Sequence, residues 1–255
     1  MGFTGIVQEI GRVREVQKEK AAKLWDGSVG KSHTFTIEAS AEILNEKTYV
    51  GESICTEGVC LTVTAFNRPA SATEKGWFQV QAAGHTLDIT MLGELVADSP
   101  VNLEKAVCVG QDISGHEVQG HVDCTVEIIK KWQDRDNLRL RFRLPQQLRS
   151  LIVMKGYVAL GGASLTVCNI TRDTFEVMLI PHTVQRITLA RRAVGDRVNV
   201  EAHVIGKYIL TQMDVALERE RFLARLALGT SLVALLTAAG AMVLTANSRL
   251  SGASR

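Results

Sequence analysis

The chain has 255 residues and a formal net charge of +2, from 29 Lys and Arg against 27 Asp and Glu. This balance argues against a nucleic-acid-binding protein that depends on a strongly basic surface, and 22% charged with 46% apolar residues excludes wholesale disorder. The mean hydropathy of +0.09 is slightly apolar for a soluble enzyme, and residues 226–248, which carry no charge, contribute much of the excess.

The N-terminus has no basic region followed by an apolar core, so we do not expect a secretory signal. The cysteines are odd in number, widely spaced and without a Cys-x-x-Cys pair, which argues against a disulfide framework or a structural zinc site and favours a reduced compartment. They are Cys55, Cys60, Cys108, Cys124 and Cys168.

Period-two patterns predict β-strands along most of the chain. In the run 59–66, Cys60, Thr62 and Thr64 alternate with apolar residues, and Arg139, Arg141 and Arg143 do the same in the run 138–144. Turn signals separate the runs, and short helices are expected near 41–46 and 145–151. Many short strands at even spacing indicate a small barrel or sandwich.

An internal repeat divides residues 1–206 into two halves. The matching segments occur in the same order in both halves, which indicates a domain duplication. They are Gly58-Val59-Cys60-Leu61-Thr62-Val63 with Gly162-Ala163-Ser164-Leu165-Thr166-Val167, His85-Thr86-Leu87 with His182-Thr183-Val184, and Val101-Asn102-Leu103-Glu104 with Val198-Asn199-Val200-Glu201. In the second half Ser164, Thr166 and Cys168 are expected on one strand face.

These segments resemble the riboflavin synthase family of the trimeric, α-chain type over about residues 1–215. The resemblance rests on the order and spacing of four segments together, because each is weak alone. They are Phe3-Thr4-Gly5-Ile6-Val7, Gly58-Val59-Cys60-Leu61-Thr62-Val63-Thr64, Gly115-His116-Glu117-Val118-Gln119-Gly120-His121-Val122-Asp123 and Ser164-Leu165-Thr166-Val167.

The resemblance implies an all-β chain of two homologous six-stranded Greek-key β-barrels in tandem, followed by a C-terminal helix. The expected parts are an N-terminal lumazine-binding barrel (1–105), a C-terminal lumazine-binding barrel (106–206) and a helix or tail (207–255). It further implies a homotrimer, joined partly by the C-terminal helix, that needs no cofactor and no metal. The implied reaction transfers four carbons between two molecules of 6,7-dimethyl-8-ribityllumazine, giving riboflavin and a ribitylamino-pyrimidinedione, at a site between two subunits.

The resemblance also implies site residues. The expected catalytic residues are Cys60, Ser53 and His121: a thiol or hydroxyl adds to the ring or activates water, and the histidine moves the methyl proton. A free cysteine is, however, most often a small buried apolar residue. The expected substrate-binding residues are Phe3, Thr4, Gly5, Thr62, Thr86, Ser164, Thr166 and Thr183, with Phe3 against the ring system.

His116 and His121 lie five residues apart, which suits neither the i, i+4 pair of a zinc-binding helix nor one face of a strand. We therefore expect no metal site there, and we expect His116 to be structural. One position departs from the family: an Asp that is a plausible contributor to catalysis is replaced by Gly161. The alternative function is a non-catalytic lumazine or flavin carrier, and the retention of both halves favours the enzyme.

The stretch 226–246 has 21 uncharged residues, about 31 Å as a helix, which matches the bilayer core. Arg219, Arg221 and Arg225 precede the stretch, whereas only Arg249 and Arg255 follow it. This excess of positive charge on the N-terminal side favours a cytoplasmic catalytic part with a membrane tail. An elongated trimerisation helix rich in small residues is the alternative.

Overall fold

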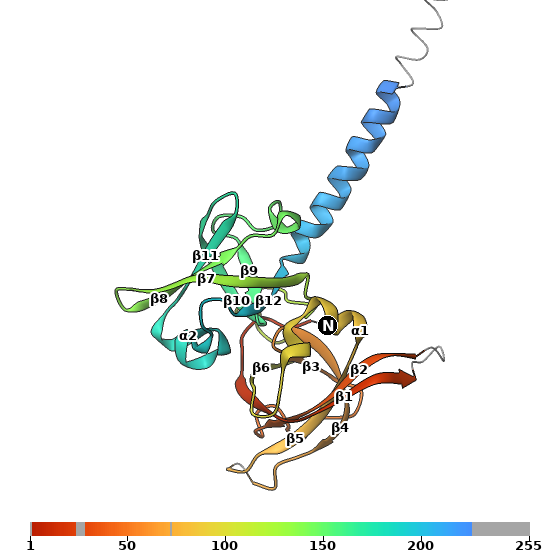
Figure 1. Ribbon diagram of the computed structural model, residues 1–255, viewed down its shortest axis with the longest axis vertical. Helices are drawn as coiled ribbons and strands as arrows, with labels where there is room; N and C mark the ends of the chain where they lie inside the picture. The colour runs from red at the N-terminus through yellow and green to blue at the C-terminus, as the bar shows by residue number, and fades with distance from the viewer. Residues whose placement is uncertain (1, 24–28, 72, 226–255) are drawn as a thin grey trace, which may run out of the picture. The chain divides into compact units, whose positions relative to one another are not determined.

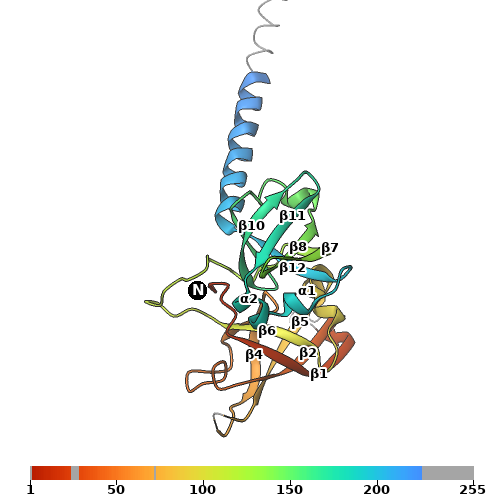
Figure 2. The ribbon, with the colours of Figure 1, turned by 90° about the vertical axis from the view of Figure 1, so that its left-hand side faces the viewer.

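The protein is described by a computed structural model that covers residues 2–23, 29–71 and 73–225. Two closed antiparallel β-barrels follow one another along the chain (Figure 1). The predicted tandem of six-stranded barrels is therefore confirmed. Figure 2 gives the same barrels turned by 90°, with the first coloured red to yellow and the second green to blue.

The first barrel has the strand order β1-β2-β5-β4-β3-β6. A short helix α1 (Gly84–Ile89) and a 3-10 helix η1 (Met91–Glu94) connect its last two strands. Its strands are β1 (Glu9–Lys23), β2 (Val29–Ala39), β3 (Ser53–Thr56), β4 (Val59–Asn67), β5 (Gly76–Ala83) and β6 (Pro100–Lys105).

The second barrel has the order β10-β11-β8-β7-β12-β9, which is the same cyclic order once each strand is matched to its counterpart in the repeat. Helix α2 (Pro181–Arg186) and the 3-10 helix η3 (Thr188–Arg191) take the places of α1 and η1, and a 3-10 helix η2 (Gln146–Leu148) follows β8. Its strands are β7 (Cys124–Asp134), β8 (Asn137–Arg143), β9 (Tyr157–Leu160), β10 (Ala163–Ile170), β11 (Thr174–Leu179) and β12 (Arg197–Ala202).

The alternation read from the sequence determines which face of each strand is buried. In β4, Val59, Leu61 and Val63 are buried in the first barrel's core, and Thr62 and Thr64 are exposed. In β10, Leu165 and Val167 are buried in the core of the second barrel, and Thr166 is exposed. Each barrel is thus filled by aliphatic and aromatic side chains, and the polar residues of β4 and β10 lie on the outside.

The helix expected near 41–46 is wrong, because these residues form turns. Ser40 directly follows β2, and its hydroxyl accepts the Glu42 N–H. The Asn45 side chain accepts the Lys47 N–H. Such local side-chain bonds satisfy the backbone without a helix. The helix expected at 145–151 is only the single 3-10 turn η2, which follows Pro145.

The chain divides into one compact unit, Met1–Lys207, which contains both barrels, and a second unit from Tyr208 onward. A helix runs over residues 204–225, as predicted for the C-terminus. In the part of the chain that the structure describes, no helix is long and apolar enough to cross a membrane. The predicted membrane stretch 226–246 lies outside the described residues.

Candidate functional site

Two short segments from opposite halves of the chain pair at the junction of the barrels. The Phe3 N–H donates to the Val118 carbonyl (2.6 Å) and the Val118 N–H to the Phe3 carbonyl (3.0 Å). The segment that begins the first half therefore lies beside the segment that begins the second. This aligns Phe3-Thr4-Gly5-Ile6 with Val118-Gln119-Gly120-His121, a repeat match that the sequence comparison missed.

A buried carboxylate holds each of these segments. Glu104 on β6 accepts the N–H groups of Thr4 (2.6 Å) and Gly5 (3.0 Å) and the Thr4 hydroxyl (2.9 Å). Its counterpart Glu201 on β12 accepts the N–H groups of Gln119 (2.7 Å) and His121 (2.9 Å). Burial raises the pKa of both glutamates, while the donated hydrogen bonds oppose that rise.

The two segments cross between the barrels at glycines. The Ser164 N–H of β10 donates to the Gly5 carbonyl (2.8 Å), and the Cys60 N–H of β4 donates to the Gly120 carbonyl (2.9 Å). Both glycines have positive φ, +74° and +75°. A Cβ added at either would lie 2.6 to 2.7 Å from the Cβ of the facing Ser164 or Cys60, so only glycine allows this approach.

The first half-site, as we call Ser53, Cys60, Thr62 and Gly120, groups three of the predicted residues. Ser53 on β3 pairs directly with Thr62 on β4, and Cys60 is two residues from Thr62 on the same face. Cys60 and Ser53 are half-buried and Thr62 is exposed. Ser53 also lines a cavity of about 430 Å³ that includes Lys105. His121 follows Gly120 and is exposed.

The second half-site, as we call Thr4, Gly5, His116, Ser164 and Thr166, contains a residue that sequence reasoning set aside. His116 is 5% exposed, its Nδ1 lies 2.6 Å from Ser164 Oγ, and its N–H donates to the Thr4 carbonyl. Burial, and to a smaller extent His203, lower the His116 pKa to about 4. The missed match of Phe3 with Val118 is the signal that locates His116 at this junction.

The side chains of three predicted binding residues lie outside the two half-sites. Thr86 and Thr183 are half-buried at equivalent positions in α1 and α2, after the strands that pair with β4 and β10. Phe3 is 2% exposed and packs with the buried Cys55, Val118 and Ala159 between the barrels. Contact of these three residues with a ligand stays a prediction.

Gly161, where the family resemblance leads to the expectation of an Asp, lies at the junction of the barrels and is buried. Its carbonyl accepts the Asn102 side-chain amide (2.8 Å), and a Cβ at this position would lie 3.3 Å from Glu57 Oε1. Glu57 holds the equivalent position in the first barrel and is 1% exposed, with bonds from the Thr188 hydroxyl (2.7 Å) and the Asn102 N–H (2.7 Å). Of the two equivalent positions 57 and 161, only the first therefore carries a carboxylate, Glu57.

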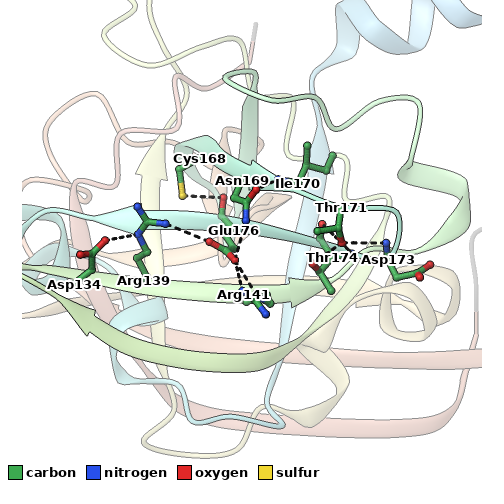
Figure 3. A network of polar contacts seen from close by, with 10 residues as sticks. All are labelled: Asp134, Arg139, Arg141, Cys168, Asn169, Ile170, Thr171, Asp173, Thr174 and Glu176. Carbon is green, nitrogen blue, oxygen red and sulfur yellow. Dashed lines mark hydrogen bonds and ion pairs between the residues drawn. The ribbon is translucent and has the colours of Figure 1, made fainter.

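The outer face of β10 beyond Thr166 is occupied by a polar network (Figure 3). Glu176 on β11 is buried and receives Arg141 Nε (2.8 Å) and the Asn169 amide (3.2 Å), while the Cys168 thiol donates to the Glu176 carbonyl (3.4 Å). Cys168 thus shares a face with Ser164 and Thr166, as predicted, but its thiol is hydrogen-bonded to the backbone of β11. Among the described residues, no group of three His, Cys, Asp or Glu side chains could hold a metal ion.

Comparison with known proteins gives one family. The model of the lumazine binding domain matches residues 4–106 and 119–203. Riboflavin synthase of Schizosaccharomyces pombe is 41% identical over 208 residues, covering 81% of this chain and 91% of the relative. Riboflavin synthase of Bacillus subtilis is 34% identical over 207 residues, covering 81% and 87%.

Solved structures with the same fold include ligand complexes of LumP. The complex with riboflavin has a TM-score of 0.64 and 20% identity, covering 78% of this chain and 98% of LumP. The complex with 6,7-dimethyl-8-(1'-D-ribityl) lumazine has a TM-score of 0.62 at the same identity and coverage. At this identity the likeness is one of fold.

Proposed function

Because the chain belongs to the riboflavin synthase family, with two lumazine-binding domains, we propose that it catalyses the dismutation of two 6,7-dimethyl-8-ribityllumazine molecules. The products are riboflavin and 5-amino-6-ribitylamino-pyrimidinedione, formed by transfer of a four-carbon unit. The observation that carries this proposal is the matched bonding of Cys60 and Ser164 to Gly120 and Gly5. A reaction between two copies of one substrate needs two related half-sites, and the chain retains both.

The proposed roles follow the chemistry of the reaction. Cys60, with Ser53 on the adjacent strand, adds to ring carbon 7 of one lumazine or activates water for that addition. His121 moves the proton lost from the 7-methyl group of the other, as a general acid–base residue. Thr62 and Thr166 supply hydroxyls that donate to or accept from the ring system, together with the remaining predicted binding residues: Phe3, Thr4, Gly5, Thr86, Ser164 and Thr183.

We propose that the complete site forms between the N-terminal barrel of one subunit and the C-terminal barrel of its neighbour, in a homotrimer joined partly by the C-terminal helix. The outward faces of β4 and β10 carry the exposed Thr62 and Thr166, which is the arrangement such a shared site needs. The proposed parts of the chain are 1–105, 106–206 and 207–255. No cofactor enters the reaction.

The test is the stoichiometry of product formation. Purified full-length chain is incubated with 6,7-dimethyl-8-ribityllumazine, and substrate and riboflavin are followed separately by absorbance and chromatography. We expect two substrate molecules to be consumed for each riboflavin formed. A stoichiometric change in ligand fluorescence without riboflavin would contradict the enzyme and support the carrier, the alternative suggested by the fold shared with LumP.

The tail 226–246 is a separate proposal, which rests on its length and lack of charge. A membrane tail would keep the full-length chain in the pellet after carbonate extraction and leave a chain truncated at residue 225 in the supernatant. Release of the full-length chain into the supernatant would contradict anchoring and favour an elongated trimer helix.

A further inference from the structure

The second half-site contains a buried imidazole that the proposed chemistry does not use. His116 Nδ1 lies 2.6 Å from Ser164 Oγ, on the strand that also presents Thr166. A hydroxyl that already has one partner has only its remaining positions for a ligand. The partner of Ser164 therefore affects what this half-site can bind.

The His116 ring has two aromatic neighbours besides Ser164. Its ring stacks on Tyr157, with centroids 5.0 Å apart and planes 8° apart, and meets His203 edge-on at 5.3 Å. At the preceding residue, Gly115, a Cβ would lie 2.1 Å from the Thr4 carbonyl oxygen and 3.0 Å from Ser164 Cβ. Only glycine lets this loop approach β10 so closely. The close approach brings the His116 imidazole within hydrogen-bond distance of Ser164.

A neutral His116 ring offers the Ser164 hydroxyl an acceptor nitrogen. Burial and His203 lower the His116 pKa to about 4, so near neutral pH the ring has one donor and one acceptor nitrogen. In the tautomer that carries its proton on Nε2, Nδ1 accepts the Ser164 hydroxyl proton over the 2.6 Å separation.

The residue types at the equivalent positions of the first half-site are different. Cys60 is the counterpart of Ser164, since the N–H of each donates to the glycine carbonyl of the crossing segment. The pairing of Phe3 with Val118 matches His116 to position 1, which is Met1. The repeat therefore provides a serine with an imidazole partner in one half and a cysteine in the other.

We propose that His116 is a positioning residue: it accepts the Ser164 hydroxyl proton in a hydrogen bond, so that the Ser164 oxygen faces the ligand only as an acceptor. The second half-site then selects a ligand N–H or O–H group at this point, which a thiol at Cys60 does not do with similar strength. This inference rests on the proposed function. It gives the two copies of one substrate different contacts, as a donor and an acceptor of four carbons require.

The first experiment is a double-mutant cycle on riboflavin binding, measured by fluorescence quenching of full-length protein. We expect Ser164→Ala and His116→Phe each to raise the Kd about five- to tenfold, the range of a lost hydrogen bond. The double variant should bind no more weakly than either single variant, because both remove the same contact. Multiplying effects, or an unchanged Kd in either single variant, would overturn the proposal.

A second pair of variants separates the hydrogen-bonding role of His116 from its packing role. His116→Phe keeps a ring against Tyr157 but has no acceptor, whereas His116→Asn loses the ring and keeps an acceptor near Nδ1. We expect His116→Asn to bind riboflavin within about threefold of the unsubstituted chain. If His116→Asn were the weaker binder of the two, with both folded by circular dichroism, His116 would have a packing role only.

The matched control is Cys60→Ala, which removes the counterpart of Ser164 in the other half-site. Its effect on Kd should multiply with that of His116→Phe, because the two residues share no contact. The proposed function fails separately: an unsubstituted chain that binds riboflavin but forms none from lumazine contradicts catalysis and leaves the cycle measurable. A chain that binds neither ligand contradicts both.

Discussion

Two buried glutamates, one in each barrel, hold the backbone of the site in place. Glu104 and Glu201 are buried, and each receives the N–H groups of the segment that crosses to the other barrel. A carboxylate accepts several such bonds at once, which compensates for the cost of its burial. The crossing glycines are thereby held against Ser164 and Cys60, although neither glutamate reaches the outward faces of β4 and β10.

At the residue scale, the roles proposed for Cys60 and His121 predict a kinetic separation. Cys60→Ala and His121→Ala should each lower kcat at least tenfold while changing the Kd for riboflavin less than threefold, because their groups act on the transition state. Steady-state kinetics and fluorescence titration measure the two quantities. An unchanged kcat with a raised KM in both variants would contradict these roles.

His116 predicts how stability depends on pH. Its ordinary pKa of 6.5 applies to the unfolded chain, and burial beside His203 lowers the pKa in the folded chain to about 4. As the pH falls through this window the unfolded state binds a proton that the folded state does not, so stability is lost. The loss is about 3 kcal/mol for a shift of this size.

The measurement is urea unfolding at pH 7.5 and pH 4.5 for the unsubstituted chain and His116→Asn. The variant should lose about 2–3 kcal/mol less between these two pH values, since asparagine does not titrate. Equal losses in the two proteins would mean that His116 is not held neutral by the fold.

At the scale of elements, the turn between β3 and β4 contacts the turn between β9 and β10 at the junction of the barrels. The equivalent position is Glu57 in the first turn and Gly161 in the second. Glu57 fills the space that faces Gly161, and Arg192 Nη2 lies 3.3 Å from its Oε1. Burial raises the Glu57 pKa, and the Arg192 charge opposes that rise. Glu57 and Asn102 therefore leave little room for a side chain at position 161.

Gly161→Asp is expected to destabilise the protein by about 1–3 kcal/mol near neutral pH, because it puts a second carboxylate beside Glu57. Gly161→Asn is the matched control, since it has the same size and the same tolerance of φ +55° without the charge. Thermal and urea unfolding measure both. Equal stabilities of the two variants would show that charge at this junction is not the cause.

At the scale of the whole molecule, reciprocal bonds join the two barrels into one unit. Asn102 donates to the Gly161 carbonyl and accepts the Thr188 N–H, and Asn199 donates to the Glu57 carbonyl and accepts the Met91 N–H, all at 2.8 Å. Each asparagine thus binds the opposite barrel with both ends of its amide. Two domains joined in this way should unfold together.

Asn102→Ala and Asn199→Ala are each expected to cost about 1–3 kcal/mol, because buried backbone groups lose their partners. In the double variant, scanning calorimetry should resolve two transitions where the unsubstituted chain has one. A single transition at an unchanged Tm in the double variant would contradict the coupling.

The sequence by itself determined the all-β class, the duplication and the outward faces of β4 and β10, because alternation and repeated segments are local patterns. The repeat also identified Cys60 and Ser164, and likewise Thr62 and Thr166, as equivalent residues of the two halves. Only the tertiary structure decided that Phe3 pairs with Val118, that Gly5 lies against Ser164, and that Gly161 faces Glu57. These contacts join residues about 100 or more positions apart, where close approach and hydrogen bonding leave no periodic signal along the chain, so the chain's local patterns do not predict that His116 lies against Ser164.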